Sequence, residues 1–377
     1  MAIRSQFPKV LLDAPVDDRI SFFKEKKVKH RNLAAAYQGL EKAIRQGNPS
    51  DLVIVYGATG VGKTTLCDRF EKDMLNTPNL MPGCIPVSRI EAIAPSSGSF
   101  DWKEYYIRGL KALNEPLIDR KCDPTTVIEK RIKANSTVIR RQSTIADLRR
   151  ALESALRHRG LFAFIVDEAQ HLKKVTSGRS LMDQMDTVKS IANTTKVKHV
   201  LVGTYELIGL TDLSGQLNRR SIEIHLPRYR YDVGDELHEF LNVVVNLEAS
   251  MPLKMRPQLS KHIDDIYIGS AGCVGILKDW LTRSYILAVD NMDKSVTLDH
   301  LLETKIPDRQ MSRIAREISE GEKQLYVEKS EEIRLMLGMG SKKASSGVSS
   351  EKKSKRNTRP GERKAKRDPV GMDVVNA

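Results

Sequence analysis

The chain contains one stretch, Gly57 to Thr64, that fits the phosphate-loop pattern G-x-x-x-x-G-K-[ST]. The glycines of such a loop let the backbone curl, so that N–H groups and the positive end of the next helix point at the phosphates of a nucleotide. Lys63 adds a positive charge for the β- and γ-phosphates, and the hydroxyl group of Thr64 is a ligand for Mg²⁺. The predicted nucleotide-binding residues of the loop are Gly57, Ala58, Thr59, Gly60, Val61, Gly62, Lys63, Thr64 and Thr65.

The flanks of the loop decide between a nucleotide site and a chance glycine-rich turn. Before it, Leu52 to Tyr56 is a continuous apolar and β-branched run, which is typical of a buried strand. After it, Thr65 to Glu71 reads as a helix. A strand, a loop and a helix in this order are the context that the motif requires, so we predict a functional nucleotide site.

A second apolar run, Leu161 to Val166, predicts another buried strand, with Asp167 and Glu168 at its carboxyl end. Ligands bind at the carboxyl ends of the strands in open α/β sheets. We therefore expect Asp167 to hold Mg²⁺ through water and Glu168 to polarise the attacking water. Alone, such an acidic pair is usually a solvated strand end, and the phosphate loop is what favours the functional interpretation.

Further candidates follow along the chain. Thr204 ends the next predicted strand and is placed to hydrogen-bond the γ-phosphate or the attacking water, unless it is an ordinary strand-ending threonine. Arg219 and Arg220 precede the last core strand; one of them is expected to reach the γ-phosphate bound by a neighbouring subunit, and surface salt bridges are the alternative. Lys278 lies in a predicted helix from Gly272 to Trp280, either as a second sensor of the nucleotide or as an exposed lysine.

The segments that carry these residues alternate between short apolar runs and longer helical patterns, which predicts an α/β fold with parallel strands. The expected strands cover residues 52–56, 85–90, 161–166, 199–203 and 222–226. Pro86 places the second strand at the edge of the sheet. The expected helices cover residues 33–44, 145–160, 235–250 and 259–290, the last two belonging to a smaller helical domain.

These patterns divide the chain into predicted parts: an N-terminal extension and helix (1–50), an ATPase core (51–228), a helical lid domain (229–305), a C-terminal helix or linker (306–340) and a basic tail (341–377). The tail carries eleven lysines and arginines against four acids, a net charge of +7. Because it has almost no large apolar residues, we expect it to be disordered. It binds nucleic acid or a partner protein, or it only keeps the protein soluble.

Overall composition indicates the class of binding partner and the cellular compartment. A net charge of +14 predicts polyanionic partners, while an aromatic content of 5% argues against a stacking platform for single-stranded nucleic acid. The four cysteines are far apart, which argues for a reducing compartment and against a zinc site. Without a signal sequence or a long apolar run, a cytoplasmic protein that makes no membrane contact is expected.

Several segments together resemble the AAA+ superfamily, and more narrowly its TniB/TnsC branch, the ATPase regulators of DNA transposition that include those of CRISPR-associated transposons. The segments are Gly57 to Thr65, Phe164 to Gln170, Gly203-Thr204, Gln216 to Arg220 and Gly272 to Trp280. The resemblance spans roughly residues 15 to 300. It implies an AAA+ P-loop NTPase with a five-stranded parallel sheet and a small helical lid, which uses ATP and Mg²⁺ and hydrolyses ATP weakly unless assembled.

The same resemblance implies a bacterial protein that forms rings or helical filaments around duplex DNA. Such a protein marks the target and recruits or activates the transposase, with a target-selection protein as a further partner. Basic loops facing the bore contact the DNA in this family, and a charge run is otherwise usually a solvated face. By position and charge, the candidates for DNA contact are Lys103, Arg131, Lys133, Arg140 and Arg141.

Two other functions remain open at this point. A replication initiator or helicase loader uses a similar ATPase, and a winged-helix or helix-turn-helix domain after the lid would favour it; residues 300–377 are short and polar for such a domain. A nucleotide-gated signalling switch belongs to a different class of function. Negligible DNA binding at moderate salt would favour the switch.

Overall fold

The computed structural model describes residues 5–46, 52–78, 80–94, 100–121, 143–173, 181–211 and 221–325, together with residues 334, 336 and 337. The basic tail predicted for 341–377 lies outside these residues. Within the described part of the chain, no helix is both long enough and apolar enough to span a membrane.

Five parallel strands form one sheet, as the sequence predicts, and their order is β2-β3-β4-β1-β5. The strands are β1 (Leu52–Tyr56), β2 (Val87–Glu91), β3 (Ala163–Asp167), β4 (Lys198–Gly203) and β5 (Ser221–His225). β1, β3 and β4 are buried along their whole length because helices cover both faces of a parallel sheet, and β2 lies at the edge. The register pairs Tyr56 with Gly203, so the carboxyl ends of β1 and β4 lie side by side.

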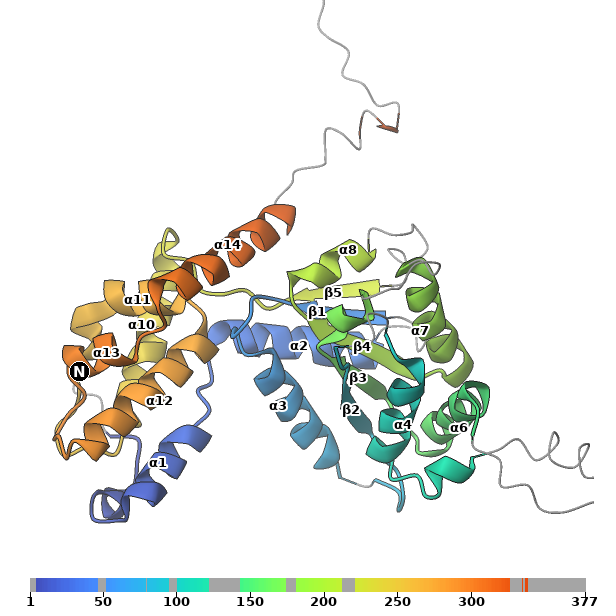
Figure 1. Cartoon of the computed structure of the whole chain (residues 1–377), viewed down its shortest axis with the longest axis horizontal. Helices are drawn as coiled ribbons and strands as arrows, with labels where there is room; N and C mark the ends of the chain where they lie inside the picture. Colours follow the sequence, from blue (N-terminus) through green and yellow to red (C-terminus); the bar gives the residue numbers. More distant parts are fainter. Residues whose placement is uncertain are drawn as a thin grey trace, which may run out of the picture. The chain divides into compact units, whose positions relative to one another are not determined.

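Helices cover both faces of the sheet. They are α2 (Arg31–Gln46), α3 (Lys63–Leu75), α4 (Trp102–Ala112), α6 (Ile145–His158), α7 (Leu181–Thr195) and α8 (Ile208–Thr211). Figure 1 shows α2 and α3 together on one side of the sheet, with α4, α6 and α7 on the other. The predicted apolar stripe of α2 is buried, and α6 begins with a capping box between Thr144 and Asp147. Short 3₁₀ turns are η1 (Lys9–Leu12), η2 (Ile118–Arg120), η3 (Ala169–Lys173), η4 (Tyr205–Leu207) and η5 (Leu259–His262).

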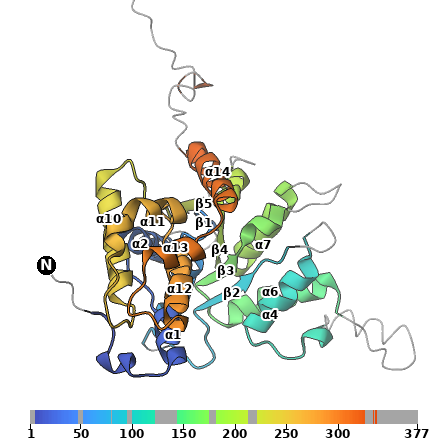
Figure 2. The same ribbon diagram turned by 60° about the vertical axis from the view of Figure 1, so that its left-hand side comes forward.

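A second apolar cluster lies among the helices that follow the sheet. They are α10 (Gly234–Ala249), α11 (Ile263–Ser270), α12 (Val274–Asp290) and α13 (Leu298–Thr304). The next helix, α14 (Asp308–Leu325), buries Met311 and Ile318 in the apolar cluster of the sheet instead. The pattern over 259–290 is broken where Ala271 and Gly272 take positive φ angles of 51° and 72°, so α11 and α12 are separate helices. An early helix, α1 (Val16–Glu25), contributes Phe23 to this cluster and lies against α12 (Figure 2).

Candidate nucleotide-binding and hydrolysis site

The phosphate loop joins β1 to α3 and has the shape of an anion cradle. Gly60 and Gly62 have φ angles of 73° and 111°, a left-handed region that favours glycine. A Cβ atom on Gly57 would lie 2.3 Å from the carbonyl oxygen of Leu226, whereas one on Gly62 would meet nothing within 4 Å. The loop is therefore packed on its inner side and open at Gly62. Because α3 begins at Lys63, its free N–H groups face this open side, which fits a bound phosphate.

The ammonium group of Lys63 lies inside this cradle. Its Nζ donates to the carbonyl oxygens of Gly57 at 3.0 Å and Ala58 at 2.9 Å, and only 7% of the residue is exposed. Burial lowers the pKa of Lys63, and the carboxylates of Glu168 and Asp167 oppose that shift. A third N–H of this ammonium group remains for an anion in the loop.

The predicted acidic pair lies at the end of β3, beside Lys63. Burial raises the pKa of Asp167, while the backbone N–H of Glu168, which donates to its Oδ1 at 3.0 Å, opposes the rise. Glu168 has a φ angle of 52°, a strained conformation for a residue other than glycine. Carboxylate and hydroxyl oxygens are ligands that Mg²⁺ prefers, so Asp167 and Thr64 form a suitable donor set.

A cavity of about 460 Å³ brings together most of the residues predicted for nucleotide binding and hydrolysis. Its volume is within the range of small-molecule sites. From the sequence-predicted set it contains Thr59, Gly60, Val61, Gly62, Lys63, Thr64, Thr65, Glu168, Thr204 and Lys278. Its other walls come from the linker between α1 and α2, from α10 and from the start of α12. The cavity therefore joins the phosphate loop to segments more than 150 residues further along the chain.

Gln170 is a site residue that the sequence analysis did not single out. Its Nε2 donates to the carboxylate of Glu168, and its Oε1 accepts the backbone N–H of Thr204 at 3.3 Å. A Cβ atom on Gly203 would lie 2.3 Å from that Oε1, so glycine is what lets the amide approach β4. The Thr204 Oγ1 is buried and has no hydrogen-bond partner among the described residues. Gln170 thus ties the acidic end of β3 to the threonine at the end of β4.

Arg89 of β2 is a second residue that the sequence analysis missed. Its guanidinium donates to Asp68 at 2.7 Å and lies 3.2 Å from Glu71, both on α3. It also lies 3.7 Å from Asp167. Arg89 therefore links the helix after the phosphate loop to the predicted Mg²⁺ ligand. One arginine in a strand is a weak signal, since its partners are revealed only by the pairing of β2 with β3.

The first turn of α12 docks directly on the phosphate loop. The carbonyl oxygen of Gly60 accepts the N–H groups of Gly275 at 2.7 Å and Ile276 at 3.2 Å. A Cβ atom on Gly275 would lie 2.4 Å from that oxygen, and one on Gly60 would lie 2.5 Å from the side chain of Ile276. The backbones of the loop and of α12 can approach this closely because neither Gly60 nor Gly275 carries a side chain.

Lys278 lines the cavity, but its ammonium group is engaged by α1. It donates to the carbonyl oxygen of Phe23 and lies 3.3 Å from the centre of the Phe23 ring. Burial lowers the pKa of Lys278 to about 7, and the charge of Lys26 adds to this, while Asp279 opposes it. Its role as a second sensor stays a prediction.

Lys278→Met should change the pH dependence of stability. The pKa of Lys278 is about 7 in the folded chain against an ordinary 10.5, so between these values the unfolded chain holds more protons. The contribution of Lys278 to the free energy of unfolding therefore rises with pH, by at most about 1.4 kcal/mol per pH unit, and is lost as the pH falls through this window. In urea unfolding at pH 6, 8 and 10, the free energy of unfolding of Lys278→Met, relative to that of native, should be highest at pH 6. A difference between the two proteins that is constant with pH would contradict the assigned environment.

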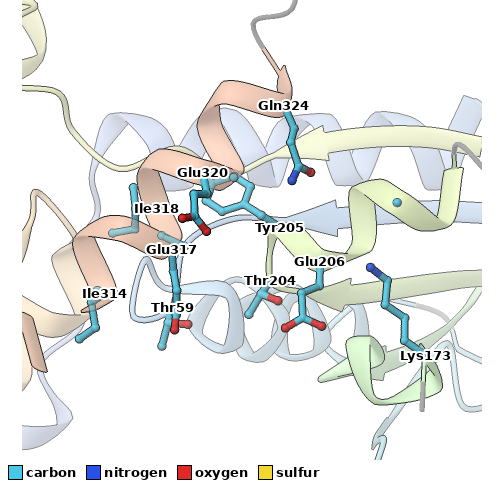
Figure 3. A pocket seen from close by; sticks show the side chains of 13 residues that line it. Thr59, Lys173, Thr204, Tyr205, Glu206, Ile314, Glu317, Ile318, Glu320 and Gln324 are labelled. Atoms are coloured by element: carbon cyan, nitrogen blue, oxygen red, sulfur yellow. The ribbon is translucent and has the colours of Figure 1, made fainter. Parts of the chain in front are cut away.

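A second cavity, of about 450 Å³, adjoins the first and shares Thr59 and Thr204 with it. Figure 3 shows Glu317 of α14 directed toward Thr59, and Glu206 beside Thr204. α14 is held there by Arg228, whose Nε lies 2.9 Å from the carboxylate of Glu322. The C-terminal helix therefore covers the Thr204 side of the site.

Other predicted residues are not brought to the cavity. Gly57, Ala58 and Asp167 lie next to it but do not line it, and Lys103 is an exposed residue of α4 that does not line it. The remaining candidates, Arg131, Lys133, Arg140, Arg141, Arg219 and Arg220, lie outside the described residues.

Residues 47–210 match the family model of an AAA domain. No curated protein matches the chain. Among solved structures, the chain is similar to a Walker-type ATPase of Pyrococcus abyssi, with 16% identity, coverage of 84% of this chain and 81% of that one, and a TM-score of 0.44.

The chain is also similar to the ORC2 protein of Aeropyrum pernix, with 14% identity, coverage of 77% and 73%, and a TM-score of 0.49. A third similar structure is the RuvB Holliday junction branch migration motor of Thermotoga maritima, with 14% identity, coverage of 75% and 72%, and a TM-score of 0.41. At these levels the structural likenesses carry no argument about activity or partners. The family match and the site together define an AAA+ P-loop NTPase fold and an ATPase.

Proposed function

We propose that this chain is an ATP-dependent, DNA-binding regulator of DNA transposition, which oligomerises on duplex target DNA and recruits or activates the transposase. The observation that carries the proposal is the cavity in which the phosphate loop, Glu168 and Thr204 meet the lid helix α12. Through it, nucleotide binding has a direct route to the helical domain. The motif resemblance and the net charge of +14 supply the transposition and DNA parts of the proposal.

Each site residue has a part in ATP hydrolysis under this proposal. The loop N–H groups and Lys63 bind the β- and γ-phosphates, while Thr64 and Asp167 hold Mg²⁺, which when bound neutralises phosphate charge. Glu168 polarises the attacking water, and Thr204 donates its hydroxyl hydrogen toward the γ-phosphate or that water. Arg219 or Arg220 of a neighbouring copy completes the site by offsetting the charge that develops on the γ-phosphate.

Duplex DNA binding rests on phosphate neutralisation in this proposal and includes little reading of base sequence. The tail 341–377, with its net charge of +7, contributes to it. The further proposed DNA contacts within a ring or filament are the five basic candidates, Lys103, Arg131, Lys133, Arg140 and Arg141.

The test combines electron microscopy with DNA titration. With duplex DNA and a non-hydrolysable ATP analogue, rings or filaments should form, and without nucleotide they should not. Deleting residues 341–377 should weaken DNA binding and make its salt dependence shallower, by ~0.9 in the logarithmic slope for each DNA phosphate that the tail no longer neutralises. ATP affinity should stay unchanged, because the phosphate loop lies in the folded core.

Two other outcomes would favour an alternative function, and a third tests the role of the tail. No DNA binding at moderate salt would favour the signalling switch. Assembly on DNA that retains a replicative helicase but no transposase would favour the loader. An unchanged salt slope after the deletion would remove the tail from the DNA interface.

A further inference from the structure

The cavity at the phosphate loop has two chemically different sets of walls. One set is polar and comes from the loop and from the ends of β3 and β4. The other set combines apolar residues from four separate elements, Val28, Leu33, Leu247 and Val274, with the charged side chains of Lys24, Lys26, Lys27, Lys278 and Asp279. Apolar walls of this kind suit a flat aromatic base, whereas phosphates are bound by the polar set. One titratable ring, that of His30, lies among the apolar walls.

The position of the proton on His30 follows from its contacts. The backbone N–H of Leu33 donates to the ring Nδ1 at 3.4 Å, and Nδ1 also lies 3.2 Å from the hydroxyl oxygen of Tyr229. An N–H group cannot accept, so Nδ1 carries the lone pair. Burial lowers the pKa of His30 to about 4, so the ring is neutral at ordinary pH. A neutral ring with an accepting Nδ1 has its proton on Nε2.

This Nε2–H donor has no hydrogen-bond partner among the residues that the structure describes. The Nε2 atom is nevertheless not one of the fully buried side-chain atoms that lack a hydrogen-bond partner, although His30 as a whole is only 8% exposed. The atom therefore keeps some access, and the space that His30 lines is the cavity. A donor fixed at an apolar wall is a recognition group for a ligand that presents an acceptor.

We propose that His30 recognises the purine ring of the bound nucleotide by donating its Nε2–H to a ring nitrogen. The acceptors that adenine offers are N1, N3 and N7, whereas its exocyclic amino group is a donor. The proposal rests on the nucleotide site and not on the transposition function. It adds a residue that contacts the base to a site otherwise defined by its phosphate-binding groups.

His30 also has a structural task, from which the proposed role must be separated. It precedes α2, and its Nδ1 accepts the N–H of the third residue of that helix, in the manner of an N-cap. Serine is a good N-cap residue but cannot reach into the cavity as an imidazole ring does. His30→Ser therefore keeps the cap and removes the donor.

The experiment measures the dissociation constants of ATP and of three ATP analogues in which carbon replaces one purine nitrogen, at N1, N3 or N7. One analogue should bind the native full-length chain ~10-fold more weakly than ATP, since its binding leaves a largely buried donor unpaired. His30→Ser should bind ATP about as weakly as native binds that analogue, and should not discriminate between the two. Its melting temperature should stay close to that of native.

Two results would overturn the proposal. One is equal binding of ATP and all three analogues by the native chain, a comparison that holds even if the variant fails to fold. The other is a folded His30→Ser protein that still discriminates against the same analogue. If native bound no nucleotide at all, the nucleotide site itself would be wrong, which is a distinguishable failure.

Discussion

Lys63→Ala should weaken nucleotide binding by about 100-fold or more, because it removes the only ammonium group that lies within the phosphate loop in the described structure. Assembly on DNA should disappear with it. Lys63 is buried and its pKa is lowered, so its removal relieves a desolvation cost and should not unfold the chain. Isothermal titration with ATP, together with thermal unfolding, measures both effects.

Lys24→Ala is the matched control for that variant. Lys24 lines the same cavity but is exposed, so its charge is screened by solvent and its removal should change ATP affinity only a few-fold. Undiminished ATP affinity in Lys63→Ala would show that the loop is not the nucleotide site. Equal weakening in both variants would show that only the general positive charge of the cavity matters.

Glu168→Gln should keep ATP binding and slow hydrolysis by ~10²-fold or more, as expected when a positioned water-activating carboxylate is removed. The substitution preserves shape, and the new carbonyl oxygen can still accept the hydrogen bond from Gln170. Assemblies on DNA should therefore last longer. Single-turnover hydrolysis and the lifetime of the assemblies are the measurements.

Glu206→Gln is the control, since this nearby carboxylate lines the second cavity and not the first. Its turnover should stay near that of native. If Glu168→Gln hydrolysed ATP at the native rate, the water-activating role would have to be assigned to another group.

The sequence predicted those parts of the site whose signals are local. The phosphate loop is one continuous motif, and the five strands are short apolar runs, so each could be read without knowledge of the rest of the chain. The same holds for Asp167 and Glu168, which directly follow a buried strand. Their proximity to Lys63 then follows from parallel pairing, because neighbouring strands end at the same edge of the sheet.

The missed features depend on contacts between distant segments. Gln170 accepts a hydrogen bond from Thr204, which lies 34 residues away. Arg89 of β2 pairs with Asp167 of β3, and only the order of the sheet makes these two strands neighbours. α4 was not expected because its buried face consists largely of Trp102, Tyr105 and Tyr106, amphipathic side chains that weaken a simple apolar pattern. α1 packs with the later helices through Phe23, a partnership that no local pattern contains.

The backbone contact between Gly60 and the start of α12 has a thermodynamic consequence. The carbonyl oxygen of Gly60 accepts two N–H groups of α12. Because of these hydrogen bonds, the conformation of the loop and the position of that helix are energetically coupled. Whatever factor a ligand of the helical domain imposes on nucleotide affinity through this contact, the nucleotide must impose the same factor on the affinity of that ligand. A partner that binds α12 and a nucleotide that binds at the phosphate loop are therefore reciprocal effectors. The effect of each can be measured as a change in the affinity of the other.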